Sequence, residues 1–241
     1  MRLNCDLGES FGHWEMGQDA ELMPLIDDAN IACGMHAGDP CVIATTLSLA
    51  KQYNVRIGAH PGYPDIQGFG RRSMQLSESE LRHVLHYQIA ALDGMARVQG
   101  LTLSYVKPHG ALYNDMMATP ALLQHIMRVV ADYPADLHLT LQANSHWQQQ
   151  QDIADSLGLR LSFEAFADRV YEDNGALVSR KLPGAVLDAQ QSVAQAMGLL
   201  DASEVKTRSG KMLKLHADTL CIHGDSPHAL TLLEALRRRA E

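Results

Sequence analysis

The sequence predicts an α/β protein, a single-domain (β/α) barrel of seven strands. Two observations support this fold class. Short apolar runs alternate with helical patterns about seven times along the 241 residues, which is typical of parallel strands joined by helices. In addition, at least five of these runs end in ionisable residues. An open doubly wound sheet gathers its ligands near one switch point, whereas a barrel gathers them from many strand ends at its C-terminal mouth. The second pattern therefore favours the barrel over the open sheet.

Each predicted strand is a short run of apolar or β-branched residues bounded by glycine or proline. The runs are residues 3–5, 28–32, 55–59, 103–106, 137–141, 160–164 and 219–222. Between them, apolar residues spaced three and four apart predict helices. These helices cover residues 21–26, 40–53, 77–99, 119–133, 145–157, 187–200 and 226–239.

Local signals define some helix starts and one insertion. Ser77 and Glu80 form a capping-box pattern at the start of the longest helix. Pro120 and Pro227 stand where proline suits the first helical position. Residues 204–215, with a Ser-Gly pair at their centre, predict a small β-hairpin inserted before the last strand.

Composition and charge exclude several classes of protein. Hydrophobic residues make up 46% of the chain and charged residues 20%, as in soluble globular proteins. The net charge of −8 argues against a nucleic-acid partner, which requires a basic face. The four cysteines form no C-x-x-C pair, and the chain has neither a signal-like start nor an apolar run of about 18 residues. We therefore expect one catalytic domain over residues 1–241, in the cytoplasm and without a membrane partner.

Ionisable residues follow several predicted strands directly, and they predict a pocket with enzymatic chemistry. Asp6, His60 and His109 could bind a divalent metal with an open position for water, or could act without metal as general acid and base. A lone histidine is most often a structural residue with one hydrogen bond. However, His36, His60 and His109 each follow a strand and lie near a glycine, which lets a ligand approach the backbone closely.

Two further features predict anion binding. Lys107 ends its strand, where an ammonium group can pair with an anion or polarise a carbonyl; the alternative is an exposed surface lysine. The loop 65–73 combines glycines with Arg71 and Arg72, and paired arginines bind oxyanions in a fork. Otherwise these arginines hold the loop in place. The loop is not a dinucleotide fingerprint, and the chain contains no P-loop.

Glu164, Asp168 and Arg169 lie at or after the sixth predicted strand. Asp168 and Arg169 could form a structural ion pair, whereas two acids at the mouth could serve glycoside hydrolysis. No G-x-S-x-G elbow supports a serine hydrolase. The remaining histidines that we expect to be structural are His13, His83, His86, His125, His138, His146 and His228.

Eight segments of the chain resemble the LamB/YcsF family. They are LNCDLGESFG (3–12), ACGMHAGD (32–39), GAHPGYPD (58–65), GFGRR (68–72), KPHGALYN (107–114), EAFADR (164–169), LVSR (177–180) and IHGD (222–225). Through this family the chain is also similar to the glycoside hydrolase/deacetylase barrels. Some of those barrels hold a metal, and Asp6, His60 and His109 match that arrangement.

The resemblance implies one component of the bacterial 5-oxoprolinase, which opens the lactam of 5-oxo-L-proline (pyroglutamate) to L-glutamate. It implies ATP, with Mg²⁺, as co-substrate and subunits B and C as partners. In the implied chemistry, Asp6 or His60 activates water, and Lys107 and His109 stabilise the developing oxyanion. Because no nucleotide-binding motif is present, we expect the partners to handle ATP wholly or in part. The expected substrate-binding residues are Glu9, His36, Arg71, Arg72, Glu164, Arg180 and His223.

Two other functions stay open from the sequence. One is a metal-dependent deacetylase or amidohydrolase that acts without ATP. The other is a non-catalytic subunit that binds a small molecule or shapes its partners.

Overall fold

The computed structural model describes residues 1–180, 182–224, 226 and 228–240, and a closed barrel of seven parallel strands forms its centre. The strands are β1 (Arg2–Leu7), β2 (Asp28–Ala32), β3 (Arg56–His60), β4 (Leu103–Val106), β5 (His138–Gln142), β6 (Arg160–Phe166) and β9 (Thr219–Ile222). They follow one another in this order around the ring, and β9 pairs with both β6 and β1 to close it. The predicted barrel is confirmed.

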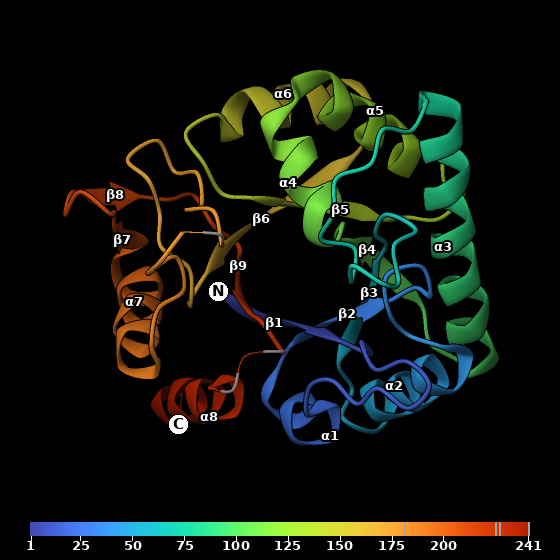
Figure 1. Ribbon diagram of the computed structural model, residues 1–241, viewed down its shortest axis with the longest axis horizontal. Coiled ribbons are helices and arrows are strands. Elements are labelled where there is room, and N and C mark those ends of the chain that lie inside the picture. The colour runs from blue at the N-terminus through green and yellow to red at the C-terminus, as the bar shows by residue number, and fades with distance from the viewer. Residues whose placement is uncertain (181, 225, 227, 241) are drawn as a thin grey trace.

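Helices surround the barrel on its outside (Figure 1). They are α1 (Asp19–Leu22), the 3-10 turn η1 (Met23–Leu25), α2 (Pro40–Gln52), α3 (Glu78–Val98), α4 (Gly110–Ala118), α5 (Pro120–Ala131), α6 (Trp147–Ser156), α7 (Ala189–Ala202) and α8 (Ala229–Ala240). The sequence pattern does not predict α4. Its Ala111, Leu112 and Tyr113 are buried in succession, so the segment lacks the one-sided apolar pattern of a surface helix.

The helix starts largely agree with the sequence. Ser77 and Glu80 form the predicted capping box, in which the Glu80 N–H donates to Ser77 Oγ at 3.2 Å and the Ser77 N–H donates to Glu80 Oε2 at 2.8 Å. Pro120 stands in the first turn of α5. Pro227 lies outside the described residues.

A two-stranded hairpin, β7 (Glu204–Lys206) and β8 (Met212–Lys214), lies between α7 and β9 in the chain. Its strands pair antiparallel, where the sequence predicts a hairpin. It projects from one side of the barrel, beyond α7 (Figure 1).

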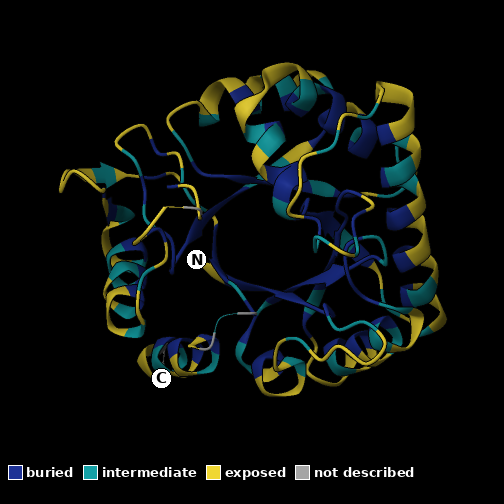
Figure 2. Ribbon diagram, viewed as in Figure 1, coloured by how far each residue is buried: buried dark blue, intermediate teal, exposed yellow. Residues whose placement is uncertain are grey.

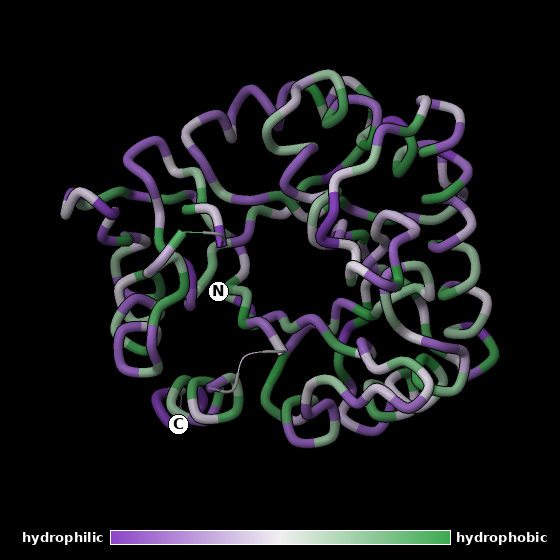
Figure 3. Tube along the Cα trace, viewed as in Figure 1, coloured by the Kyte–Doolittle hydropathy of each residue, from purple (hydrophilic) through white to green (hydrophobic). Residues whose placement is uncertain are grey.

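The apolar core lies between the strands and the inner faces of the helices. Figure 2 shows buried strands inside helices whose outer faces are exposed, and Figure 3 shows hydrophilic and hydrophobic residues alternating along those helices. The strands are buried on both faces, which explains why they read as short apolar runs rather than alternating ones.

The N-terminal half of the barrel interior is filled by polar and aromatic side chains. The Tyr105 ring packs directly on Gly58, where no larger residue leaves room for it. The Tyr105 hydroxyl donates to Asn30 Oδ1 at 2.7 Å, and Asn30 Nδ2 donates to Asp6 Oδ1 at 2.7 Å. This hydrogen-bonded column supports Asp6 from below, on the axis of the barrel.

Among the residues that the structure describes, none of the helices is both long enough and apolar enough to span a membrane.

Candidate active site

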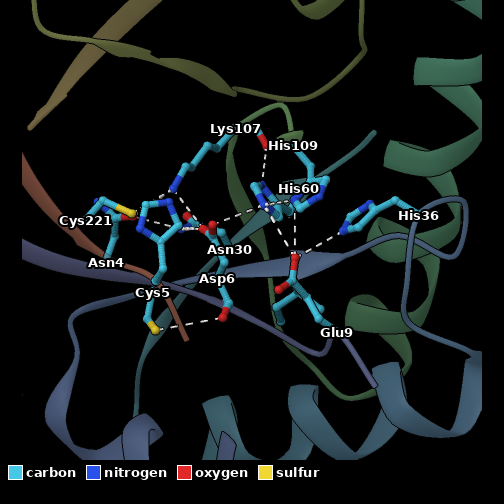
Figure 4. A network of polar contacts seen from close by, with 12 residues as sticks. Asn4, Cys5, Asp6, Glu9, Asn30, His36, His60, Lys107, His109 and Cys221 are labelled. Carbon is cyan, nitrogen blue, oxygen red and sulfur yellow. Dashed lines mark hydrogen bonds and ion pairs between the residues drawn. The ribbon is translucent and has the colours of Figure 1, made fainter. Parts of the chain in front are cut away.

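The predicted polar strand ends meet at one mouth of the barrel. A cavity of about 640 Å³ opens there. Its lining includes Asp6 from β1, His60 from β3, Lys107 and His109 after β4, and His223 after β9. Since the strands are parallel, their carboxyl ends share this mouth, as in other barrels of alternating strands and helices. Figure 4 shows how the side chains of Asp6, His60, Lys107 and His109 point toward one another.

Asp6 and Lys107 form the centre of the network. Lys107 Nζ donates to Asp6 Oδ1 at 2.8 Å and lies 3.1 Å from Glu164 Oε2, with all three side chains almost fully buried. Burial acts to raise the pKa of Asp6, but His60 and Lys107 hold it well below its usual range. Burial likewise acts to lower the pKa of Lys107, and Asp6 outweighs it. The exposed surface lysine is therefore the wrong alternative for Lys107.

His60 and His109 lie next to Asp6 in fixed orientations. His60 Nδ1 donates to the backbone carbonyl of Lys107 at 2.7 Å, and its Nε2 lies 3.4 Å from Asp6 Oδ2. His109 Nε2 donates to the backbone carbonyl of Phe69 at 2.9 Å. The remaining nitrogens, His60 Nε2 and His109 Nδ1, are 3.0 Å apart. Burial acts to lower the pKa of His60, but Asp6 raises it overall.

Glu9 and His36 extend this group on the side away from Lys107. One oxygen of Glu9, Oε1, lies 3.2 Å from His36 Nε2, 3.3 Å from His109 Nδ1 and 3.9 Å from His60 Nε2. The rings of His36 and His109 stack at 3.7 Å between centroids. Burial and the neighbouring imidazoles lower the pKa of both His36 and His109 well below the usual value.

Glu164 and His36 are not among the residues that line the cavity, although the sequence predicts that both bind substrate. Glu164 is fully buried behind Lys107. Tyr113 on α4 is a lining residue, and burial and the Glu164 carboxylate raise the pKa of its hydroxyl well above the usual value. Glu164 Oε2 lies 3.1 Å from Lys107 Nζ, and the His36 ring stacks on His109, so each contacts a residue of the lining. Their role in substrate binding stays a prediction.

His223 pairs with Asp168 at the edge of the cavity. His223 Nδ1 lies 2.9 Å from both carboxylate oxygens of Asp168, and its ring stacks on Phe166 at 5.5 Å. Burial acts to raise the pKa of Asp168, and His223 lowers it. The predicted ion pair of Asp168 with Arg169 is replaced by this contact, because Arg169 turns its guanidinium to the carbonyls of Val178 and Ala185.

Three arginines are among the residues that line the cavity. Arg71, Arg169 and Arg180 all contribute to its wall. Burial and the nearby Arg180 lower the pKa of Arg169 to about 10. Positive charge in the cavity lining favours a bound carboxylate or phosphate.

Arg72 is placed differently from the prediction. Its side chain is 64% exposed and forms an ion pair with Asp65, which also accepts from the Gly68 N–H at 3.0 Å. Arg72 does not line the cavity and holds its loop in place, the alternative left open by the sequence. Besides the Arg71 side chain, the loop contributes its backbone to the site, since the Phe69 carbonyl fixes the His109 ring.

Several contributors to the site are not predicted from the sequence. Asn4 and Asn30 position Asp6 and Lys107, and Cys221 Sγ lies 3.1 Å from Lys107 Nζ. Asn4 and Cys221 stand within strand-end segments that the sequence does single out. Asn30 carries no such signal, because it lies in the middle of a buried strand.

Two groups of side chains have the spacing of metal ligands among the described residues. One is Glu9 with His36, His60 and His109, and the other is Asp6 with Cys221 and His223. Lys107 already supplies a cation to Asp6 and Cys221 in the second group. The predicted triad of Asp6, His60 and His109 is not brought together as one such group, although Asp6 and His60 are adjacent.

Comparisons with known proteins show the family of the chain. The chain is 52% identical to the A subunit of 5-oxoprolinase from Pseudomonas fluorescens, over 98% of this chain and 95% of that protein. It is 47% identical to the A subunit of 5-oxoprolinase from Vibrio cholerae, over 98% and 96% of the two chains. The crystal structure of a lactam utilization protein from Thermus thermophilus superposes with a TM-score of 0.90, at 37% identity, over 100% of this chain and 97% of that one. The sequence profile of the LamB/YcsF family matches residues 1–241, and the chain belongs to this family.

Proposed function

We propose that this protein carries out the hydrolytic step of an ATP-dependent 5-oxoprolinase, opening 5-oxo-L-proline to L-glutamate together with subunits B and C. The names of its close relatives support a role in 5-oxoproline metabolism within a multi-subunit enzyme. The observation that carries the proposal is the cavity itself, whose lining combines buried acid–base groups with arginines.

The substrate has the two features that this cavity suits. Arg71 and Arg180 line the cavity and can bind the carboxylate of 5-oxoproline or a phosphate. Asp6, Lys107 and His223, which also line the cavity, can form hydrogen bonds at the amide. Cavities of about 300–1,000 Å³ accommodate drug-sized ligands, so one of about 640 Å³ has room for the small ring and a phosphoryl group together.

ATP is needed because a five-membered lactam is a stable amide. Transfer of the γ-phosphoryl group to the amide oxygen gives an imidate phosphate and ADP. Water then adds to the activated carbon, and the tetrahedral species collapses by breaking the C–N bond, which gives the free amine and a γ-glutamyl phosphate. A second water molecule cleaves this acyl phosphate to the carboxylate of glutamate and inorganic phosphate. The chain has no recognisable nucleotide-binding motif, so we assign phosphoryl transfer to the partner subunits.

Asp6 and His223 are placed to act on the water. An Asp6 oxygen and a His223 ring nitrogen lie within 4.8 Å of each other, a separation that one water molecule can bridge by hydrogen bonds. Asp168 holds His223 Nδ1, which leaves Nε2 to take the proton of the water and deliver it to the ring nitrogen. Asp6 orients the water, and Lys107 keeps Asp6 ionised.

The hydrogen bonds of His109 change one predicted role. Its Nε2–H is committed to Phe69, and its Nδ1 faces His60, so His109 is not a donor to the oxyanion in this proposal. The oxyanion instead lies nearest to the positive charge of Lys107 at the cavity wall.

The proposal is tested by reconstituting the chain with its two partner subunits and following glutamate release from 5-oxoproline with ATP present. Substitution His223→Gln should lower kcat by about 10²-fold or more, the range for loss of a general acid–base group. Asp168→Asn should also lower kcat. His83→Gln, which changes an exposed histidine on α3, is the matched control and should keep full activity.

Two results would count against the proposal. Full turnover by His223→Gln would remove the acid–base role of this mouth. Tight ATP binding by the isolated chain would contradict the assignment of phosphoryl transfer to the partners. Hydrolysis of amides or acetylated sugars without ATP or partners would instead favour the deacetylase or amidohydrolase alternative.

A further inference from the structure

We propose that Glu9, His36, His60 and His109 form a binding site for one divalent transition-metal ion of the zinc type. All four side chains are buried at the barrel mouth, and their candidate ligand atoms lie within 4.8 Å of one another. The proposal goes beyond the hydrolytic function above, and it does not depend on which substrate the cavity takes.

The imidazole lone pairs of His60 and His109 point toward each other. A backbone carbonyl only accepts hydrogen bonds, so Lys107 O places the proton of His60 on Nδ1, and Phe69 O places the proton of His109 on Nε2. In the neutral rings, the lone pairs of His60 Nε2 and His109 Nδ1 then face each other across 3.0 Å. Two facing lone pairs repel unless a positive species lies between or beside them.

Ligand atoms from all four side chains converge around Glu9 Oε1. Glu9 Oε1 lies 3.3 Å from His109 Nδ1 and 3.9 Å from His60 Nε2, and His36 Nε2 lies 3.2 Å from the same oxygen. A proton bridges only two of these atoms. A metal ion can be shared by all four.

The spacing of the four ligand atoms suits a zinc-sized ion. Zinc bound tetrahedrally at about 2.0–2.1 Å to nitrogen and oxygen places neighbouring ligand atoms about 3.4 Å apart. Four of the six separations between these side chains run from 3.0 to 3.9 Å, on both sides of that value, and the other two are within 4.8 Å. The four side chains therefore need only small adjustments to surround an ion of this size.

The surroundings also match those of known metal centres. Histidine ligands in proteins usually donate their second ring nitrogen to a carbonyl or carboxylate, which fixes the ring. His60 and His109 both do so with backbone carbonyls. Three imidazoles and one carboxylate favour ions of borderline softness, such as Zn²⁺ or Co²⁺, over Mg²⁺ or Ca²⁺.

This set differs from the triad suggested by the sequence, because Glu9 and His36 replace Asp6. Asp6 Oδ1 accepts from Asn30 and from the Lys107 ammonium, whose positive charge disfavours a metal cation at the same oxygen. Asp6 therefore stays beside the metal site without being one of its ligands.

The experiment is calorimetric titration of the chelator-treated full chain with ZnCl₂, together with the absorption spectrum after adding CoCl₂. We expect one ion per chain and the intense visible bands of tetrahedral cobalt. His36→Gln should weaken Zn²⁺ binding by at least ~10-fold, because even partners of metal ligands matter by about 10–100-fold. Asp6→Asn should bind Zn²⁺ like the unchanged chain. His125→Gln alters a buried histidine on α5 and is the matched control.

Three results would overturn the proposal: no saturable binding by the unchanged chain, binding that His36→Gln leaves intact, or loss of binding in Asp6→Asn but not in His36→Gln. Circular dichroism of each variant checks that it is folded, and Glu9→Gln provides a second ligand variant if His36→Gln does not fold. Since these measurements use neither ATP nor substrate, the metal site and the hydrolytic function can fail separately.

Discussion

His138 should make the protein less stable in mild acid. It starts β5 at the N-terminal end of the barrel, and its ring stacks on Tyr105 at 5.3 Å between centroids. Burial, together with the positive charges of Arg56 and Arg160, lowers its pKa from 6.5 to about 4, against a smaller opposing effect of Asp28. The unfolded chain therefore binds a proton at this residue at a higher pH than the folded chain does.

The size of the effect follows from the two pKa values of His138. Above pH 6.5 the His138 ring is neutral in both the folded and the unfolded chain, so it does not change the free energy of unfolding. As the pH falls from 6.5 to 4, the unfolded state takes up the proton first, so the free energy of unfolding decreases. The shift from 6.5 to about 4 corresponds to about 3 kcal/mol in full, at about 1.4 kcal/mol per pKa unit, of which about 2 kcal/mol is lost by pH 5.

Urea denaturation at pH 7 and pH 5 of the unchanged chain and of His138→Phe measures this effect. Phenylalanine keeps an aromatic ring against Tyr105 but cannot take up a proton. The unchanged chain should therefore lose about 2 kcal/mol more between these pH values than the variant does. The exposed His83 provides the control, since His83→Gln should leave the pH dependence nearly unchanged. Equal losses in the unchanged chain and His138→Phe would refute the reasoning.

Three further predictions concern stability. Gly58→Ala should lower the free energy of unfolding by about 3 kcal/mol or more, because an added methyl would overlap the Tyr105 ring. Adding Tyr105→Leu should recover part of that loss in thermal denaturation. An unchanged Tm in Gly58→Ala would contradict the packing. Lys107→Met should lower the free energy of unfolding by about 3–5 kcal/mol, since it leaves buried carboxylates without their cation. A chevron or equilibrium urea curve at pH 7 would measure this loss. A cost below about 1 kcal/mol would show that the carboxylates find other partners. Ser77→Ala should lower the free energy of unfolding by about 1 kcal/mol through loss of the α3 cap, whereas Ser77→Asp should retain most of the stability. Equal losses in both variants would argue against the cap.

The fold can be predicted well because its signals are local. The predicted runs 28–32, 103–106 and 219–222 have the bounds found for β2, β4 and β9, since each is a short buried run between breakers. The helix α4 escapes prediction because its buried residues are consecutive rather than spaced by three and four.

The site is predictable as a set of strand ends but not as a set of contacts. The sequence singles out Asp6, His60, Lys107 and His109, and the barrel brings them together. Their hydrogen-bond partners depend on side chains far apart in the chain. Asp168, for example, pairs with a histidine 55 residues away rather than with its neighbour in sequence. No spacing rule along one strand or loop gives such a pair.

Closure of the barrel by β9 has a consequence for how the protein is made. The Asn4 side chain on β1 donates to Thr219 on β9 at 2.9 Å, across 215 residues of chain. Contacts this distant in sequence form late, because a long loop must close before they contribute. During synthesis, the first strand waits for nearly the whole chain to be translated before it gains its second neighbour. Cys221 and His223 arrive with that last strand, so the mouth of the barrel is completed only at the end of folding.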